Sequence, residues 1–163
     1  MGIMQRFGGL VGSAWLLAAA SGQATLPTIE IRTIAEVETT ATNAGRESVH
    51  LSPANRVVPG DRLIYTVEIR NAGASDVVAP TVTQPIPAHV AYVADSASGP
   101  GVEVTFSVDG GATFDRPEAL GVPGADGKMR SAAAADYTHI RWQFKNTLKS
   151  KSLAYARFRA VVK

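Results

Sequence analysis

The sequence predicts an all-β protein, an antiparallel β-sandwich of about 7–9 strands. Three observations lead to this fold class. Short segments alternate apolar and polar residues with the period of two that is typical of half-buried strands. Turn-forming residues separate these segments about every ten residues, the spacing of a sandwich. No segment sustains the 3.6-residue period of an amphipathic helix.

The first predicted strands lie in residues 29–51. Apolar residues at 29, 31, 35 and 37 alternate with mostly polar neighbours and predict an extended strand, with Ile34 interrupting its polar side. A turn follows at Thr42-Asn43-Ala44-Gly45, and Ser48–Leu51 forms a short return strand.

The central part of the chain predicts three further strands. Residues 63–70 alternate, with apolar residues at 63, 65, 67 and 69 set against Ile64, Thr66, Glu68 and Arg70. This strand lies between the turn at Val58-Pro59-Gly60-Asp61 and the turn at Asn71-Ala72-Gly73. Val77–Thr83 follows as an edge or bulged strand, because Pro80 cannot donate to a ladder. The stiff Pro85-Ile86-Pro87 then leads into a strand at Val90–Ala94.

The last part predicts three strands around a long loop. Residues 102–108 alternate most clearly, and 117–135 forms a loop rich in Gly, Ala and Pro, with at most one helical turn at Ser131–Ala135. Residues 140–145 and 153–162 supply the final strands. From their apolar positions we predict these core residues: Tyr65, Val67, Phe106, Ile140, Trp142 and Phe158.

The N-terminal residues 1–24 have the pattern of an export signal. Arg6 supplies the positive charge, Phe7–Ala20 is apolar, and Gly22-Gln23-Ala24 places small residues for cleavage after Ala24, with cleavage after Ala20 as the alternative. About 14 apolar residues are too few for a membrane span, which needs about 20, so we expect no transmembrane segment in the mature chain; an uncleaved anchor is the alternative. We expect 25–56 to form an N-terminal strand extension and 57–163 the sandwich domain.

Composition narrows the class of protein further. The chain has no Cys, so an exported domain must be held together by burial and sheet hydrogen bonds without disulfides. The formal net charge is only +2, one charge of which belongs to Arg6, so nothing argues for a nucleic-acid partner. We expect an exported protein of the periplasm, cell surface or extracellular space.

Several motifs together resemble a known family. These are Val58-Pro59-Gly60-Asp61, Tyr65-Thr66-Val67, Asn71-Ala72-Gly73 and Ile86-Pro87, with Phe106–Gly111 and Asp136–Trp142 downstream. Over residues 57–163 the chain resembles the bacterial cell-surface repeat called domain of unknown function 11, in its single-domain exported subset. The resemblance implies an immunoglobulin-like sandwich. Gln84 stands where the family commonly has an acidic residue, which argues against an isopeptide crosslink there.

The acidic and histidine residues suggest no metal or cofactor. Ser107-x-Asp109-x-Gly111-x-Thr113-Phe114 has the spacing of the Asp-box, a hairpin turn in which the carboxylate accepts backbone N–H bonds, and we interpret it as structural. Asp109, Asp115 and Asp126 lack the ordered spacing of a calcium loop. His50, His89 and His139 are far apart in the sequence, and we expect His139 to be exposed.

The remaining motifs also assign no catalytic residue. No Gly-x-Ser-x-Gly or Cys nucleophile is present, and Gly124–Lys128 is followed by Met129 where a phosphate loop needs Ser or Thr. One candidate binding surface is a basic strand face suited to anionic glycans or phospholipids, formed by Arg141, Lys145, Lys149, Lys151, Arg157 and Arg159. Outward charges more often serve solubility and discourage edge pairing.

We therefore expect a non-enzymatic exported module with an adhesion, scaffold or envelope-structural role. Its partner would be a surface protein, a glycan or another copy of itself. The alternatives are a fibre subunit that donates residues 25–40 to a neighbour, and a carbohydrate-binding module with Trp142 and Tyr155 in an aromatic row; a hydrolase comes last. For residues 25–40 we expect pairing with the chain's own sheet.

Overall fold

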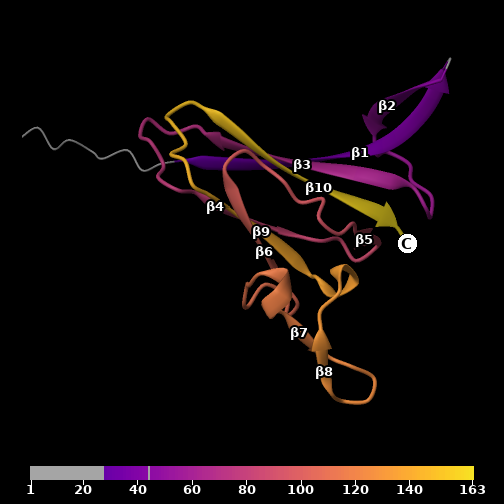
Figure 1. The fold of residues 1–163 in the computed structure, drawn as a ribbon. Helices are drawn as coiled ribbons and strands as arrows, with labels where there is room; N and C mark the ends of the chain where they lie inside the picture. Colours follow the sequence, from indigo (N-terminus) through magenta and orange to yellow (C-terminus); the bar gives the residue numbers. More distant parts are fainter. Residues whose placement is uncertain (1–27, 44) are drawn as a thin grey trace, which may run out of the picture.

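The computed structural model describes residues 28–43 and 45–163, so the predicted export signal lies outside the described residues. Ten strands and two short 3-10 helices follow one another along these residues (Figure 1). In chain order they are β1 (Ile29–Asn43), β2 (Arg46–Pro53), β3 (Arg62–Asn71), β4 (Thr81–Pro85), β5 (Val90–Tyr92), β6 (Val102–Ser107), η1 (Pro117–Ala119), β7 (Gly121–Pro123), β8 (Met129–Ser131), η2 (Ala134–Asp136), β9 (His139–Phe144) and β10 (Leu153–Val162).

The strands form two main antiparallel sheets that pack face to face. The larger sheet has the order β2-β1-β3-β10-β5, and the smaller has the order β4-β9-β6. Strands β7 and β8 pair only with each other, as a small hairpin that projects from the body (Figure 1). The predicted all-β sandwich is confirmed.

The strand order bears on the immunoglobulin-like expectation. In a constant-type immunoglobulin domain the last strand belongs to the three-stranded sheet. Here the last strand, β10, lies in the larger sheet between β3 and β5. The antiparallel sandwich is thus present, while immunoglobulin connectivity is not confirmed.

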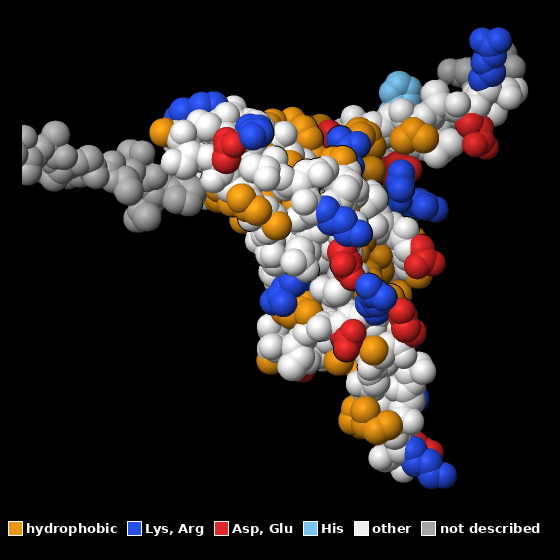
Figure 2. Space-filling model, turned by 60° about the vertical axis from the view of Figure 1, so that its left-hand side comes forward, with side chains coloured by type: hydrophobic (Ala, Val, Ile, Leu, Met, Phe, Trp, Pro, Cys, Tyr) orange, Lys and Arg blue, Asp and Glu red, His pale blue; other side chains and the backbone are white. Residues whose placement is uncertain are grey.

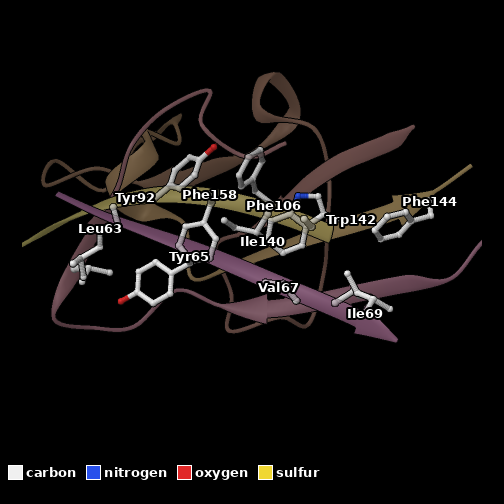
Figure 3. Packing of buried hydrophobic residues seen from close by; sticks show 14 of the residues in the cluster. Leu63, Tyr65, Val67, Ile69, Tyr92, Phe106, Ile140, Trp142, Phe144 and Phe158 are labelled. Carbon is white, nitrogen blue, oxygen red and sulfur yellow. The ribbon is translucent and has the colours of Figure 1, made fainter. Parts of the chain in front are cut away.

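The core lies between the two sheets and contains all six residues predicted for it. Tyr65, Val67, Phe106, Ile140, Trp142 and Phe158 are each at most 6% exposed. Figure 3 shows side chains from β3, β9 and β10 meeting in this layer. The ring centroids of Trp142 in the smaller sheet and Phe158 in the larger are 6.2 Å apart, so aromatic packing joins the sheets.

A buried asparagine fixes one end of the core. The Asn71 side chain, at the end of β3, donates to the carbonyls of Ser75 (2.8 Å), Leu148 (3.1 Å) and Lys149 (3.2 Å), and its Oδ1 accepts from the Gly73 N–H at 3.1 Å. The predicted turn Asn71-Ala72-Gly73 therefore also ties β3 to the loop between β9 and β10.

Two predicted elements differ from the structure. The strand expected over Val77–Thr83 begins only at Thr81, because Pro80 precedes it; Val77 forms an isolated bridge with Leu148 instead. The loop expected over 117–135 contains the β7–β8 hairpin and residues 134 and 135 of η2, which lies where one helical turn was expected. It also contains η1, a second short 3-10 turn that the sequence did not predict. Since β7 and β8 have three residues each, they are too short for a periodic sequence signal.

Candidate interaction surface

A two-stranded arm projects from the sandwich and is formed by the second half of β1 and by β2 (Figure 1). We define the arm as residues 37–43 and 46–53. The register joins Val37 to Ser52 and continues to Asn43 opposite Arg46, and Gly45 in the turn has a φ of +76°, which favours glycine. Both strands run longer than the sequence pattern indicated.

The arm joins the sandwich at its base, where Val37 pairs with Leu63 of β3 and Glu38 pairs with Arg159. Every residue of β2 is exposed, including Val49 (57%) and Leu51 (45%). These two apolar side chains are two positions apart, so they share one face of the strand. Figure 2 shows the arm standing clear of the body, with hydrophobic side chains among its charged ones.

The backbone of β2 has an unpaired side. The Ala54 N–H donates to the Ala35 carbonyl at 3.1 Å, which fixes the alternation of the antiparallel ladder. Ser48, His50 and Ser52 then point their N–H and C=O groups at β1. The backbone groups of Glu47, Val49 and Leu51 consequently point away from β1, toward solvent.

The other three edges of the two main sheets, as the described residues form them, are protected. Strand β4 is flanked by Pro80 and ends in Pro85. Along β6, Phe106 exchanges two backbone bonds with Asp115 (2.9 and 3.0 Å). Strand β5 has only three residues, and η2 packs beside it. These are the usual devices against edge pairing.

Strand β2 lacks such protection along its middle. Residues 48–51 include no Pro, Lys or acidic residue, and Pro53 comes only at the last position. The first half of β1 continues the same open side, because β2 pairs only with Glu36–Asn43, and Ile31 there is 52% exposed. An unprotected edge with apolar side chains is a template for an added strand.

The predicted Asp-box forms a closed network of hydrogen bonds. Asp109 accepts from the Ser107 hydroxyl at 2.7 Å, the Thr113 hydroxyl at 2.6 Å and the Ala112 N–H at 3.1 Å. Gly110 and Gly111 have φ values of +77° and +91°. The carboxylate is therefore occupied within its own turn, in agreement with a structural role.

The same turn is held against β9. The Thr138 hydroxyl donates to the Ser107 carbonyl and accepts from the Gly110 N–H, both at 3.1 Å. Phe114 then lies beneath Arg141, whose guanidinium carbon is 3.5 Å from the ring centroid. His139 is half-buried next to Phe114 rather than exposed as expected, because the turn folds over it.

We expect Asp109→Asn to lower the melting temperature at pH 7. Hydrogen bonds from Thr113, and to a smaller extent from Ser107, hold the pKa of the Asp109 carboxyl well below its ordinary value of 3.8. Because the pKa of this carboxyl is lower in the folded state than in the unfolded state, the ionised carboxylate stabilises the fold at pH values above its unfolded-state pKa. This stabilisation is lost as the pH falls from the unfolded-state pKa toward the folded-state pKa. The difference between parent and variant should therefore be full at pH 7 and shrink below about pH 4. Melting curves from pH 7 to pH 2 measure it.

The control for this prediction is Asp126→Asn in the β7–β8 turn, where the carboxylate accepts a bond from the Lys128 N–H. Its effect should be smaller at pH 7. An Asp109→Asn difference that stays constant down to pH 2 would show that ionisation of the Asp109 carboxyl does not stabilise the fold.

The basic strand face is not formed. Arg141 lies on the outer face of the smaller sheet, since it alternates with buried Ile140 and Trp142. Arg157 and Arg159 lie on the outer face of the larger sheet, on the opposite side of the sandwich, and Lys149 and Lys151 lie in the loop before β10. Arg159 also pairs with Glu38 at 2.8 Å.

The predicted aromatic row is not formed either. Trp142 is fully buried between the sheets, whereas Tyr155 is 40% exposed on the outer face of the larger sheet. Tyr155 instead lines an open hollow with Ser98, Gly99, Pro100 and Arg157. The two aromatic side chains therefore cannot present one surface to a sugar.

The carboxylates and histidines singled out in the sequence are not brought into one cluster. Asp109, Asp115 and Asp126 make separate local contacts. Within residues 28–43 and 45–163, no group of three or more His, Cys, Asp or Glu side chains is arranged to hold a metal ion. In the same residues, none of the helices has the length and apolar character needed to cross a membrane.

Comparisons of the chain with protein-family models, curated proteins and solved structures found no match.

Proposed function

We propose that the protein is an exported, non-enzymatic module with an adhesion, scaffold or envelope-structural role, and that it binds a protein partner by adding a strand to β2. The observation that carries this proposal is the exposed β2 edge, with its outward backbone groups at Glu47, Val49 and Leu51. Main-chain hydrogen bonds supply affinity in such a complex, and alternate side chains supply specificity.

Two further features support a binding role for the arm. Burying an exposed Val or Leu side chain contributes about 1.5–3 kcal/mol, so covering Val49 and Leu51 is a substantial driving force. The arm also stands clear of the body, so a partner strand reaches its edge without meeting the smaller sheet (Figure 1). Export is supported by the Arg6, apolar and small-residue pattern of the N-terminal sequence.

The structure gives less support to the two rival functions. Residues of β1 pair with β3 from Ile29 to Val37, so this strand lies in its own sheet instead of being presented for donation. Trp142 is buried in the core, so it cannot contribute to a sugar-binding row of aromatic side chains. The arm is the better candidate surface.

The test introduces a Lys at the centre of the edge, as Val49→Lys. It compares how much of the exported variant and of the exported parent is retained on the cell envelope. We expect the variant to be released at least about tenfold more than the parent, since losing burial of one Val weakens binding by about 1.4 kcal/mol or more. The matched control is Val78→Lys, because Val78 is 77% exposed but lies outside the arm.

Equal release of the two Lys variants would overturn the proposal. Mass spectrometry of the same exported protein gives its N-terminus, which we expect at Thr25. Recovery of intact Met1 in the cytoplasm would contradict export.

A further inference from the structure

We propose that the strand added to β2 is β2 of a second copy of this chain, antiparallel to the first about a two-fold axis. This inference rests on the proposed function, because it names the partner of the same edge. It turns two five-stranded sheets into one sheet continuous across the dimer.

The backbone of β2 fits a second β2. In an antiparallel pair, outward N–H and C=O groups of one strand must meet outward groups of the other. The outward positions 49 and 51 meet when Val49 lies opposite Leu51 of the second copy, and each of these two symmetric pairs can exchange backbone hydrogen bonds. The outward position 47 then lies opposite Pro53, which has no N–H to donate. This register places His50 opposite His50 of the second copy, as a non-hydrogen-bonded pair on the axis.

The side chains of β2 are self-complementary in this register. On one face Val49 lies beside Leu51 of the second copy, and the two-fold axis repeats this contact between Leu51 and the Val49 of the second copy. Both exposed apolar side chains of each copy therefore gain an apolar neighbour. On the other face Ser48 lies opposite Ser52. Glu47 lies opposite Pro53, so no carboxylate faces another carboxylate, a contact that would oppose pairing.

The shape of the arm permits this pairing. Its seven β1 residues, Val37–Asn43, extend about 20 Å at 3.3 Å per residue. Antiparallel pairing sets the two sandwich bodies at opposite ends of a four-stranded bridge, with the turn of each arm beside the base of the other. A two-fold contact of one patch with itself is closed, and it therefore gives a dimer and not a fibre.

The first test is analytical ultracentrifugation of the purified protein over a range of concentrations. We expect a monomer–dimer equilibrium, with a dissociation constant raised at least about tenfold by Val49→Lys and unchanged by Val78→Lys. A protein that stays monomeric at hundreds of micromolar, or one that forms open polymers, would overturn the second-copy proposal.

The second test is a disulfide crosslink between the two copies at the two-fold axis. The chain has no Cys, so His50→Cys introduces a single thiol, and across a two-fold axis its Cα atoms would lie within the range that a disulfide spans. With oxidised glutathione added as the electron acceptor, we expect the two thiols to form a disulfide rapidly and give a covalent dimer, and no such dimer for Val78→Cys at equal concentration. Adding Val49→Pro, or Val49→Lys if the Pro variant does not fold, should abolish crosslinking. Equal crosslinking of both single-Cys variants would overturn the proposal.

The outcomes separate this inference from the proposed function. If the protein is monomeric but Val49→Lys still releases it from the envelope, the β2 edge binds a different protein and only the second-copy proposal fails. If Val49→Lys changes neither retention nor association, both fail.

Discussion

Replacing Trp142 by Ala is expected to lower the free energy of unfolding by about 3–5 kcal/mol. Trp142 is fully buried in the middle of β9, and its ring packs against Phe158 of the opposite sheet. Truncation leaves a large cavity at the point where the two sheets meet (Figure 3). Denaturant unfolding followed by circular dichroism measures the loss.

The control for this prediction is Tyr155→Ala on the outer face of the larger sheet. Because Tyr155 is substantially exposed, its truncation should cost far less. Trp142→Phe, which keeps an aromatic ring in the core, should fall between the parent and Trp142→Ala. If the Trp142→Ala and Tyr155→Ala variants unfold at the same denaturant concentration, the packing described between β9 and β10 is wrong.

Replacing Asn71 by Ala is expected to cost at least about 2–3 kcal/mol, although it removes only a small side chain. Its amide donates to three backbone carbonyls, and its oxygen accepts from the Gly73 N–H. Ala supplies none of these bonds, and the buried Gly73 N–H loses its acceptor. A buried polar group without a partner costs about 1–3 kcal/mol.

The matched control is Asn55→Ala, which removes the same group from an exposed position. Its effect on the free energy of unfolding should stay within about 0.5 kcal/mol. Equal stability of the two Ala variants would show that Asn71 does not tie β3 to the loop before β10.

The fold class and core could be predicted because they depend on local alternation. In β9 and β10 each buried apolar position is followed by a more exposed one, and the period of two in the sequence shows this directly. In β3 the same period places Tyr65 and Val67 in the core, although Ile64 on the other face is buried as well. For Asn71 the sequence predicts only a place in a turn. Its partners at Leu148 and Lys149 are more than seventy residues away in the chain, and no local pattern contains that information.

The binding surfaces were harder to predict because sheet membership is not local. The six basic residues considered as one surface lie between positions 141 and 159, yet β9 and β10 belong to opposite sheets. The sequence indicated a short return strand at Ser48–Leu51, and a strand is present there. Whether Val49 and Leu51 are covered depends on what packs over β2. Their exposure can therefore be seen only in the three-dimensional structure.

Amide hydrogen exchange resolved by residue shows whether the outward side of β2 is a strand-binding edge that a second copy uses. In dilute protein the Ser48 and His50 amides should be protected by β1, while the Val49 and Leu51 amides exchange quickly. Raising the protein concentration should slow exchange at Val49 and Leu51 and leave Ser48 and His50 unchanged. Val49 and Leu51 amides that exchange equally fast at all concentrations would contradict the claim.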